Sequence, residues 1–208
     1  MSVRDEPKYA WLGRAAIEAI LIVFAVVLGF IVNEWREGVQ RQQASDTALE
    51  RIAEEMEANA AALRLVVGYH ENVADNLGEA IERIERGEAS EEGVLFDVLP
   101  PIMPRGIQEP RLTTVAWDLA RERGDLDPVD YRMMSDIALI YSAQSGGADS
   151  SWRSIAETFF LSTESLERRP LLPKLRLMQA SFSELVAQEQ YLIGLYDRQI
   201  EDVRAALE

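Results

Sequence analysis

Residues 15–35 read AAIEAILIVFAVVLGFIVNEW, and no residue between Ala19 and Val32 is charged or strongly polar. A helix of this length rises about 31 Å, which is close to the hydrocarbon thickness of a bilayer. Trp11 and Trp35 flank the stretch at the depths where aromatic side chains gather in membranes. The stretch therefore predicts one transmembrane helix, and the rest of the chain becomes a water-soluble domain held at a membrane surface.

Two other interpretations of this stretch are a signal-peptide core and a buried helix of a soluble protein. A cleaved signal needs small residues after its core, whereas this chain continues with Asn33, Glu34 and Trp35. A buried helix at the edge of a soluble core carries a polar stripe, whereas residues 19–32 are apolar all round. Both observations favour an uncleaved membrane span.

Five residues of this region are candidates for contacts between membrane helices. Glu18 lies about one turn inside the expected boundary, and Arg14 lies four residues earlier on the same helix face. Gly29 follows Ala25 at the small-xxx-small spacing that permits close helix approach. The remaining candidates close the apolar stretch: Asn33 and Trp35. A Glu18 that is simply solvated among lipid headgroups is the alternative.

The spacing of Glu18, Asn33 and Trp35 resembles a bacterial family of unknown function that opens with a single membrane helix. The pattern in that family is Glu, fourteen residues, Asn, one residue and Trp, often followed by Glu and Arg. The family usually has Gly about seven residues after the Glu, where this chain has Ala25. Residues 113–126, TTVAWDLARERGDL, are similar to its second recurring patch. The resemblance implies an architecture and supplies no catalytic residue.

Composition limits the possible partners and chemistry of the soluble domain. The chain has 208 residues, a net charge of −15 and no cysteine. Such acidity argues against nucleic acid and anionic lipid surfaces as partners of that domain. The lack of cysteine excludes disulfides and thiolate catalysis. We expect a tail at residues 1–14, a span at 15–35 and an acidic domain at 36–208.

Arginine and lysine counts on the two sides of the span nearly tie, with Arg4, Lys8 and Arg14 before it and Arg36, Arg41 and Arg51 after it. A short N-terminus tends to stay inside, and the domain is strongly acidic. We therefore expect a bacterial inner-membrane protein with a cytoplasmic N-terminus and the domain outside.

A heptad pattern follows the span and predicts a long helix that ends near Arg86, before Gly87. Its two sets of seam positions are Leu49, Met56, Leu63, His70, Leu77 and Ile84, and Ile52, Asn59, Val66, Val73 and Ala80. The end of the chain repeats this logic with Leu175, Met178, Phe182, Leu185, Leu192, Tyr196, Val203 and Leu207. Two long seamed helices predict an all-α antiparallel bundle.

Shorter helices are expected between the two long ones. A loop is expected from Pro100, and Thr113 or Thr114 can cap a helix that Gly124 ends. Asp127-Pro128 is typical of a helix start, and Gly146-Gly147 is typical of a helix end. Ser150 or Ser151 would then cap the next helix, which Pro170 and Pro173 end.

His70, the only histidine, and Asn59 are the polar members of the seam. As a metal ligand or base, His70 would need neighbours such as Glu71, Asp75 or Glu189, and no metal-binding helical spacing surrounds it. A packed core or interface histidine is the favoured interpretation. Asn59 is interpreted as a residue that sets helix register.

No metal, cofactor-binding or nucleophile motif accompanies this architecture. The sequence therefore favours a non-enzymatic, membrane-anchored helical interaction protein. It would be an accessory or assembly subunit of a membrane complex, or a homo-oligomer. The alternative is an extracytoplasmic bundle that senses a small-molecule ligand. The expected partners are the lipid bilayer and a membrane protein or a second copy, with no cofactor and no nucleic acid.

Overall fold

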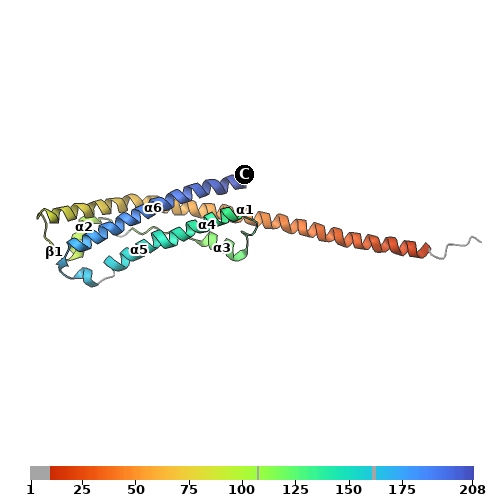
Figure 1. The fold of residues 1–208 in the computed structure, drawn as a ribbon, viewed down its shortest axis with the longest axis horizontal. Coiled ribbons are helices and arrows are strands. Elements are labelled where there is room, and N and C mark those ends of the chain that lie inside the picture. Colours follow the sequence, from red (N-terminus) through yellow and green to blue (C-terminus); the bar gives the residue numbers. More distant parts are fainter. Residues whose placement is uncertain (1–9, 107, 161–162) are drawn as a thin grey trace, which may run out of the picture.

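A single helix runs from near the N-terminus to the far tip of the molecule. The computed structural model describes residues 10–106, 108–160 and 163–208. Helix α1 spans Ala10–Glu85, 76 residues without a break, and is therefore about 114 Å long. Its first part projects alone, and its second part belongs to a helical bundle (Figure 1). The helix begins at Ala10, inside the segment that was expected to be a tail, and ends one residue before Arg86, as predicted.

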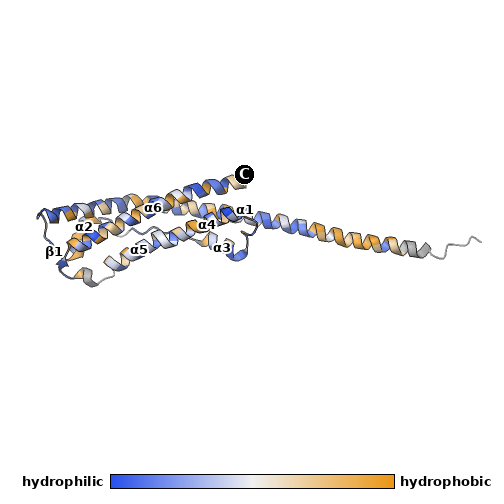
Figure 2. Ribbon diagram, viewed as in Figure 1, coloured by the Kyte–Doolittle hydropathy of each residue, from blue (hydrophilic) through white to orange (hydrophobic). Residues whose placement is uncertain are grey.

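The projecting part of α1 carries the apolar stretch. Every described side chain from Ala15 to Ala44 is exposed, and residues 15–35 form the mainly apolar band in Figure 2, with Glu18, Asn33 and Glu34 as its polar members. By length and composition, this is one helix that is able to cross a membrane. The first buried side chain is Ser45. Residues 36–44 thus separate the bundle from the apolar band by about 15 Å of helix.

The bundle half of α1 pairs with the last helix, α6, which spans Leu172–Leu207. The two run antiparallel, so α6 ends close to the point where α1 leaves the bundle (Figure 1). The seam positions of α1 that are buried are Leu49, Ile52, Met56, Asn59, Leu63, His70, Val73 and Leu77. Those of α6 are Leu175, Met178, Phe182, Leu185, Leu192, Tyr196 and Val203. The all-α antiparallel bundle is confirmed.

Short elements pack across this helical pair. Near the tip, β1 (Glu92–Gly93) and β2 (Arg169–Pro170) form a two-residue antiparallel ladder beside α2 (Leu95–Ile102). Helix α3 (Val115–Arg123) and the start of α4 (Tyr131–Ala143) lie at the other end, where α1 leaves the bundle (Figure 1). Between the two ends run the π-helical turn η1 (Gln144–Ala148), α5 (Asp149–Ile155), the second π-helical turn η2 (Ala156–Phe160) and the short helix η3 (Thr163–Leu166).

Two expected helix boundaries are wrong and one is confirmed. Helix α4 begins at Tyr131 rather than after Asp127-Pro128, because Asp130 accepts the Arg132 N–H at 2.9 Å and caps it. Gly124 ends α3 with a left-handed φ of 73°, as predicted. Gly146-Gly147 does not end a helix: the chain runs through η1 directly into α5, so the serines at 150 and 151 lie inside a helix.

The prolines also act differently from expectation. Pro100 and Pro101 lie inside α2, where the Met103 N–H still donates to the Leu99 carbonyl at 2.7 Å and closes the helix. Pro173 occupies the first turn of α6 and starts that helix, because the first N–H groups of a helix need no intrahelical partner.

The buried side chains form two clusters along the rod. One surrounds Leu63 and Trp117 in the half nearer the apolar band. The other surrounds Leu77 and Phe182 in the half nearer the tip. Buried polar side chains lie along this core, and we treat them as candidates for function.

Candidate functional sites

The sequence-predicted membrane contacts remain on an uncovered helix. Glu18, Gly29 and Trp35 contact no other element of the described structure, and a Cβ added at Gly29 would meet nothing within 4 Å. Asn33 donates from Nδ2 to Glu37 Oε1 at 2.6 Å, which occupies it within its own helix. The Arg14 side chain lies outside the described residues. Their roles in helix contact remain predictions.

Asn59 joins three elements at the level of the first core cluster. Its Oδ1 accepts the Thr113 N–H at 2.9 Å, and its Nδ2 donates to the Thr113 carbonyl at 2.8 Å. Gln144 Oε1 lies 3.4 Å from the same Nδ2 and accepts the Tyr196 hydroxyl at 2.5 Å. Burial raises the pKa of Tyr196, which keeps its hydroxyl a donor. Asn59 is thus bonded to the loop before α3, to η1 and to α6, and its role in setting helix register stays a prediction.

The π-helical turn explains how Gln144 reaches this layer. A π turn inserts one residue into a helix and redirects the following side chains. Gln144 is the first residue of η1 and is 1% exposed. Gly146 and Gly147 provide a turn without bulky side chains at this point. Sequence reasoning missed Gln144 because the Gly-Gly pair suggested a break.

Glu55 organises the start of α3 from a neighbouring helix. Its Oε2 accepts the Ala116 N–H at 3.0 Å, and its Oε1 accepts the Tyr141 hydroxyl at 2.8 Å. The threonine side chains give α3 no cap, so the carboxylate takes this role at the positive helix end. Burial and the neighbouring Glu55 carboxylate raise the pKa of Tyr141. Trp117 stacks on Tyr141 with 5.5 Å between ring centroids. The stacked rings of Trp117 and Tyr141 both belong to the first core cluster.

His70 and Glu189 form a fully buried pair between α1 and α6. The Nδ1 atom of His70 lies 3.0 Å from both Glu189 carboxyl oxygens, and both side chains are at most 1% exposed. The Nε2 atom of His70 lies 2.8 Å from the carbonyl oxygen of Gln108, in the segment between α2 and α3. The ring also stacks on Trp152 at 5.7 Å and meets Phe182 at 5.9 Å.

The hydrogen-bond partners of His70 indicate which of its ring nitrogens carry a hydrogen. A carbonyl oxygen only accepts, so the Nε2 atom of His70 carries a hydrogen. A carboxylate also only accepts, so one proton lies between Nδ1 and Glu189, either as imidazolium with carboxylate or as imidazole with carboxylic acid. Both forms leave the pair neutral overall, which is what burial favours.

This pair corrects one expectation about His70. If His70 were only a packed seam residue, its replacement by leucine would be neutral or stabilising, because a polar group would leave the interior. The structure shows three hydrogen-bonding contacts instead, and leucine would leave Glu189 buried without a partner. The described residues contain no group of three or more histidine, aspartate or glutamate side chains that could hold a metal ion.

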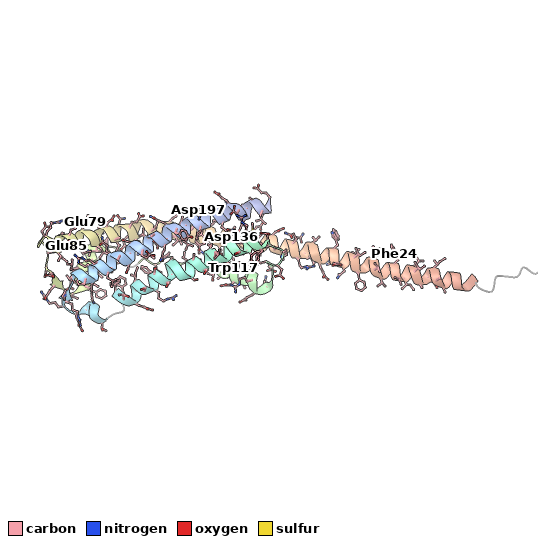
Figure 3. The ribbon with its side chains drawn as sticks, viewed as in Figure 1. Phe24, Glu79, Glu85, Trp117, Asp136 and Asp197 are labelled. Atoms are coloured by element: carbon pink, nitrogen blue, oxygen red, sulfur yellow. The ribbon has the colours of Figure 1, made fainter. Side chains whose placement is uncertain are left out.

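A groove between α4 and α6 exposes apolar side chains on the bundle surface. It has a volume of about 550 Å³. Leu139 and Tyr191 both line the groove, and their exposed fractions are 64% and 62%. Asp136 and Arg198 also line it, and Figure 3 shows Asp136 on α4. We call this surface the α4–α6 groove: Asp136, Leu139, Ile140, Ser142, Ala143, Tyr191, Leu195, Arg198, Gln199 and Asp202.

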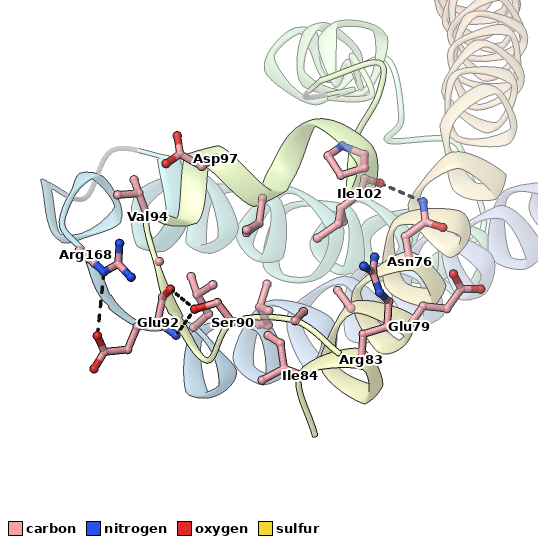
Figure 4. A pocket seen from close by; sticks show the side chains of 17 residues that line it. Asn76, Glu79, Arg83, Ile84, Ser90, Glu92, Val94, Asp97, Ile102 and Arg168 are labelled. Atoms are coloured by element: carbon pink, nitrogen blue, oxygen red, sulfur yellow. Dashed lines mark hydrogen bonds and ion pairs between the residues drawn. The ribbon is translucent and has the colours of Figure 1, made fainter. Parts of the chain in front are cut away.

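A cavity of about 460 Å³ lies at the tip, where the last turns of α1 meet α2 and the start of α6 (Figure 4). We call it the tip cavity. Figure 1 places α2 and the last turns of α1, which line the cavity, at the opposite end of the molecule from the apolar part of α1. The two surfaces and the buried polar layers are thus separate features of one rod.

No family model, curated protein or solved structure matches this chain. The functional argument therefore rests on the geometry above.

The functional candidates that the sequence pattern does not reveal share one property: their partners are distant in the chain. Glu55 and Tyr141 are 86 residues apart, and His70 and Glu189 are 119 apart. Glu189 was one of several possible neighbours of His70. The available signal was that Glu189 lies on the apolar seam of the last helix, between Leu185 and Leu192.

Proposed function

We propose that this chain is a membrane-anchored, non-catalytic interaction protein that associates with a second copy of itself through the α4–α6 groove. The observation that carries the proposal is that two strongly exposed apolar side chains, Leu139 and Tyr191, lie together in one surface groove with Asp136 and Arg198 beside them. Exposed apolar patches rimmed by polar residues are typical of protein interaction sites.

The membrane anchor supports a second copy as the partner. Two copies in one bilayer stand parallel, so α4 of one chain faces α6 of the other at a similar height. Leu139 then packs near Tyr191 or Leu195 of its partner copy, and Asp136 approaches Arg198 of that copy. The same patch on both chains is the requirement of a twofold interface. Tethering also raises the effective concentration of one copy for the other.

The apolar part of α1 extends this interface into the bilayer. Ala25 and Gly29 provide a flat helix surface there, with Asn33 and Trp35 at its boundary. Glu18 and Arg14 at the other boundary are further candidates for this contact. Together with the groove, these positions form two separate contact regions on the same chain.

The non-catalytic part of the proposal is supported by the use of the buried polar groups. Asn59, Gln144 and Tyr196 bond to one another, and His70 bonds to Glu189. These layers lie inside the bundle rather than in an open site. Their geometry is suited to fixing helix register.

The proposed location is a bacterial inner membrane, with the N-terminus in the cytoplasm and the bundle outside. The acidity of the domain supports this orientation. Membership in the family with the Glu-x14-Asn-x-Trp membrane helix is part of the same proposal. It is supported by Glu18, Asn33 and Trp35.

A ligand-sensing bundle is the second candidate function. The tip cavity favours it, because volumes of roughly 300–1,000 Å³ are typical of small-molecule sites. Sensing and self-association use different surfaces, so each can be tested separately.

Cysteine crosslinking tests self-association directly, because the natural chain has no cysteine to interfere. Full-length Leu139→Cys and Leu195→Cys chains, carrying tags of different size, are co-expressed in membranes and treated with a short bifunctional maleimide. We expect a crosslinked species that contains both tags. A matched control is Leu177→Cys, which is 54% exposed near the other end of α6 and should not crosslink.

The products distinguish the possible partners by mass. A species with both tags supports the second copy. A species that joins either cysteine to a different membrane protein would favour an accessory subunit. Monomer alone, with both cysteines reactive toward a maleimide dye, would contradict the groove as an interface.

A further inference from the structure

The tip cavity is built by four separate segments of the chain. Helix α1 supplies Arg83, the following loop supplies Ser90, α2 supplies Asp97, and α6 supplies Leu175. The β1–β2 ladder holds the loop in place, and the Leu171 N–H donates to the Glu91 carbonyl at 2.8 Å. A Cβ on Gly93 would meet Leu171 at 3.0 Å, so glycine permits this close approach. The cavity is therefore a defined feature of the tip.

The floor of the cavity is apolar and the rim is charged. Ile102, Leu171 and Leu175 close the floor, with exposed fractions of 4%, 3% and 1%, and the half-buried Ile84 adds open apolar surface on the α1 side. Val94 and Val98 add apolar surface on the α2 side. A ligand with an apolar body would cover this surface and displace water from it.

Arg83 differs from the other arginines near the tip. Arg86 pairs with Glu82 and Glu88, and Arg176 pairs with Glu85. The guanidinium of Arg83 makes no hydrogen bond or ion pair in the part of the chain that the structure describes. It lines the cavity and presents five donors suited to a carboxylate.

Carboxylates complete the rim. Asp97 lies on the α2 side of the cavity and Arg83 on the α1 side, as Figure 4 shows. The Asp97 side chain makes no hydrogen bond or ion pair within the described residues. The cavity thus combines Arg83 and Asp97, which make no hydrogen bond or ion pair within the described residues, with the Arg168–Glu92 ion pair and an apolar floor.

We propose that the tip cavity binds a small zwitterion with an apolar body, of the class of short apolar peptides. The ligand carboxylate pairs with Arg83, the ligand ammonium pairs with Asp97, and the apolar side chains of the ligand cover Ile84, Val94 and Val98. This inference deepens the sensing alternative and is independent of the α4–α6 groove.

The probe is the dipeptide leucyl-leucine, titrated calorimetrically into the full chain in lipid nanodiscs. We expect saturable binding. Arg83→Gln and Asp97→Asn should each weaken it by at least about tenfold, as expected when a charge-assisted hydrogen bond is lost. Arg86→Gln is the matched control and should bind like the natural chain, because Arg86 faces Glu82 and Glu88 instead.

Chemical variants of the probe separate the two charged contacts. N-acetylated leucyl-leucine lacks the ammonium, so it should bind weakly and be insensitive to Asp97→Asn. The amide of the dipeptide lacks the carboxylate, so it should be insensitive to Arg83→Gln. Thermal melts establish that each variant is folded.

Several results would overturn the proposal. They are an absence of saturable binding to the folded natural chain, Arg83→Gln or Asp97→Asn binding as tightly as that chain, or an equal loss in Arg86→Gln. Leu139→Asp, which should disrupt self-association, is measured in parallel. Unchanged dipeptide binding in that variant keeps this test separate from the proposed interface.

Discussion

The two halves of α1 form one unbroken helix but bury their side chains in opposite ways. In the half that contains Phe24 and Leu28, apolar side chains cover every face and no part of the described chain covers them. In the half that contains Leu63, one apolar seam is buried and the remaining faces are charged. The contrast teaches that helix propensity did not set the fold here. What separates the halves is the pattern of apolar residues: one half is apolar on every face and able to cross a membrane, and the other buries a single seam against the bundle.

The largest expected effect tests the polar member of the buried seam. His70→Leu should lower the free energy of unfolding of the bundle by ~3–5 kcal/mol, because Glu189 is left buried and unpaired. Chemical denaturation of the full chain in detergent, followed by circular dichroism, measures it.

The double variant His70→Leu with Glu189→Leu is the matched control. It removes both charges, so it should recover most or all of the stability lost in the single variant. A harmless single variant would contradict the paired geometry. A double variant as unstable as the single one would show that the loss comes from packing.

The next prediction compares one substitution in the two halves of α1. Leu63→Ala should cost ~2–5 kcal/mol of bundle stability, since Leu63 is fully buried between α1 and α6. Leu28→Ala should leave the melting temperature of the bundle unchanged, because Leu28 contacts none of it. Equal losses in both variants would mean that the two halves are not independent.

A charge in the apolar half gives an effect of similar size in a different observable. Leu28→Arg places a cation near the middle of the stretch and should disfavour membrane insertion by about 2.5–3.5 kcal/mol. The fraction of chain in the membrane pellet should fall, while the bundle itself remains helical. Full retention in the pellet would indicate an attachment other than this stretch.

The smallest expected effect concerns Asp149, the first residue of α5 in the bundle. Burial raises its pKa, with a partly compensating hydrogen bond from Gln144. A carboxyl with a raised folded-state pKa costs stability when ionised, and the cost disappears as pH falls below its ordinary value. Asp149→Asn should therefore raise the melting temperature slightly at pH 7. The difference should shrink in acid, and a difference that grew in acid would contradict the sign.

The sequence predicted those features of the fold that depend on local pattern. Heptad spacing identified the buried faces of α1 and α6, and Gly87 and Gly124 marked the ends of α1 and α3. It failed where a distant residue decides the outcome. Gly146-Gly147 looked like the end of a helix. The hydrogen bond between Gln144 and Tyr196 joins residues that are 52 positions apart, so the local pattern does not reveal it.

The candidate sites were less predictable than the fold. His70 was identified as a seam residue, but its partner Glu189 depends on how two helices align along their length. The tip cavity joins residues from 76 to 175, which only the closed bundle brings together. The α4–α6 groove likewise requires two helices that are distant in sequence.

Membrane extraction tests the central contrast most directly. Membranes from cells that express the full chain are washed with alkaline carbonate, and the pellet and supernatant are probed for it. We predict that the chain stays in the pellet with an N-terminus that still includes residues 15–35. Release into the supernatant, or a pelleted or soluble product that begins after Trp35, would contradict the account of α1 as one helix in two media.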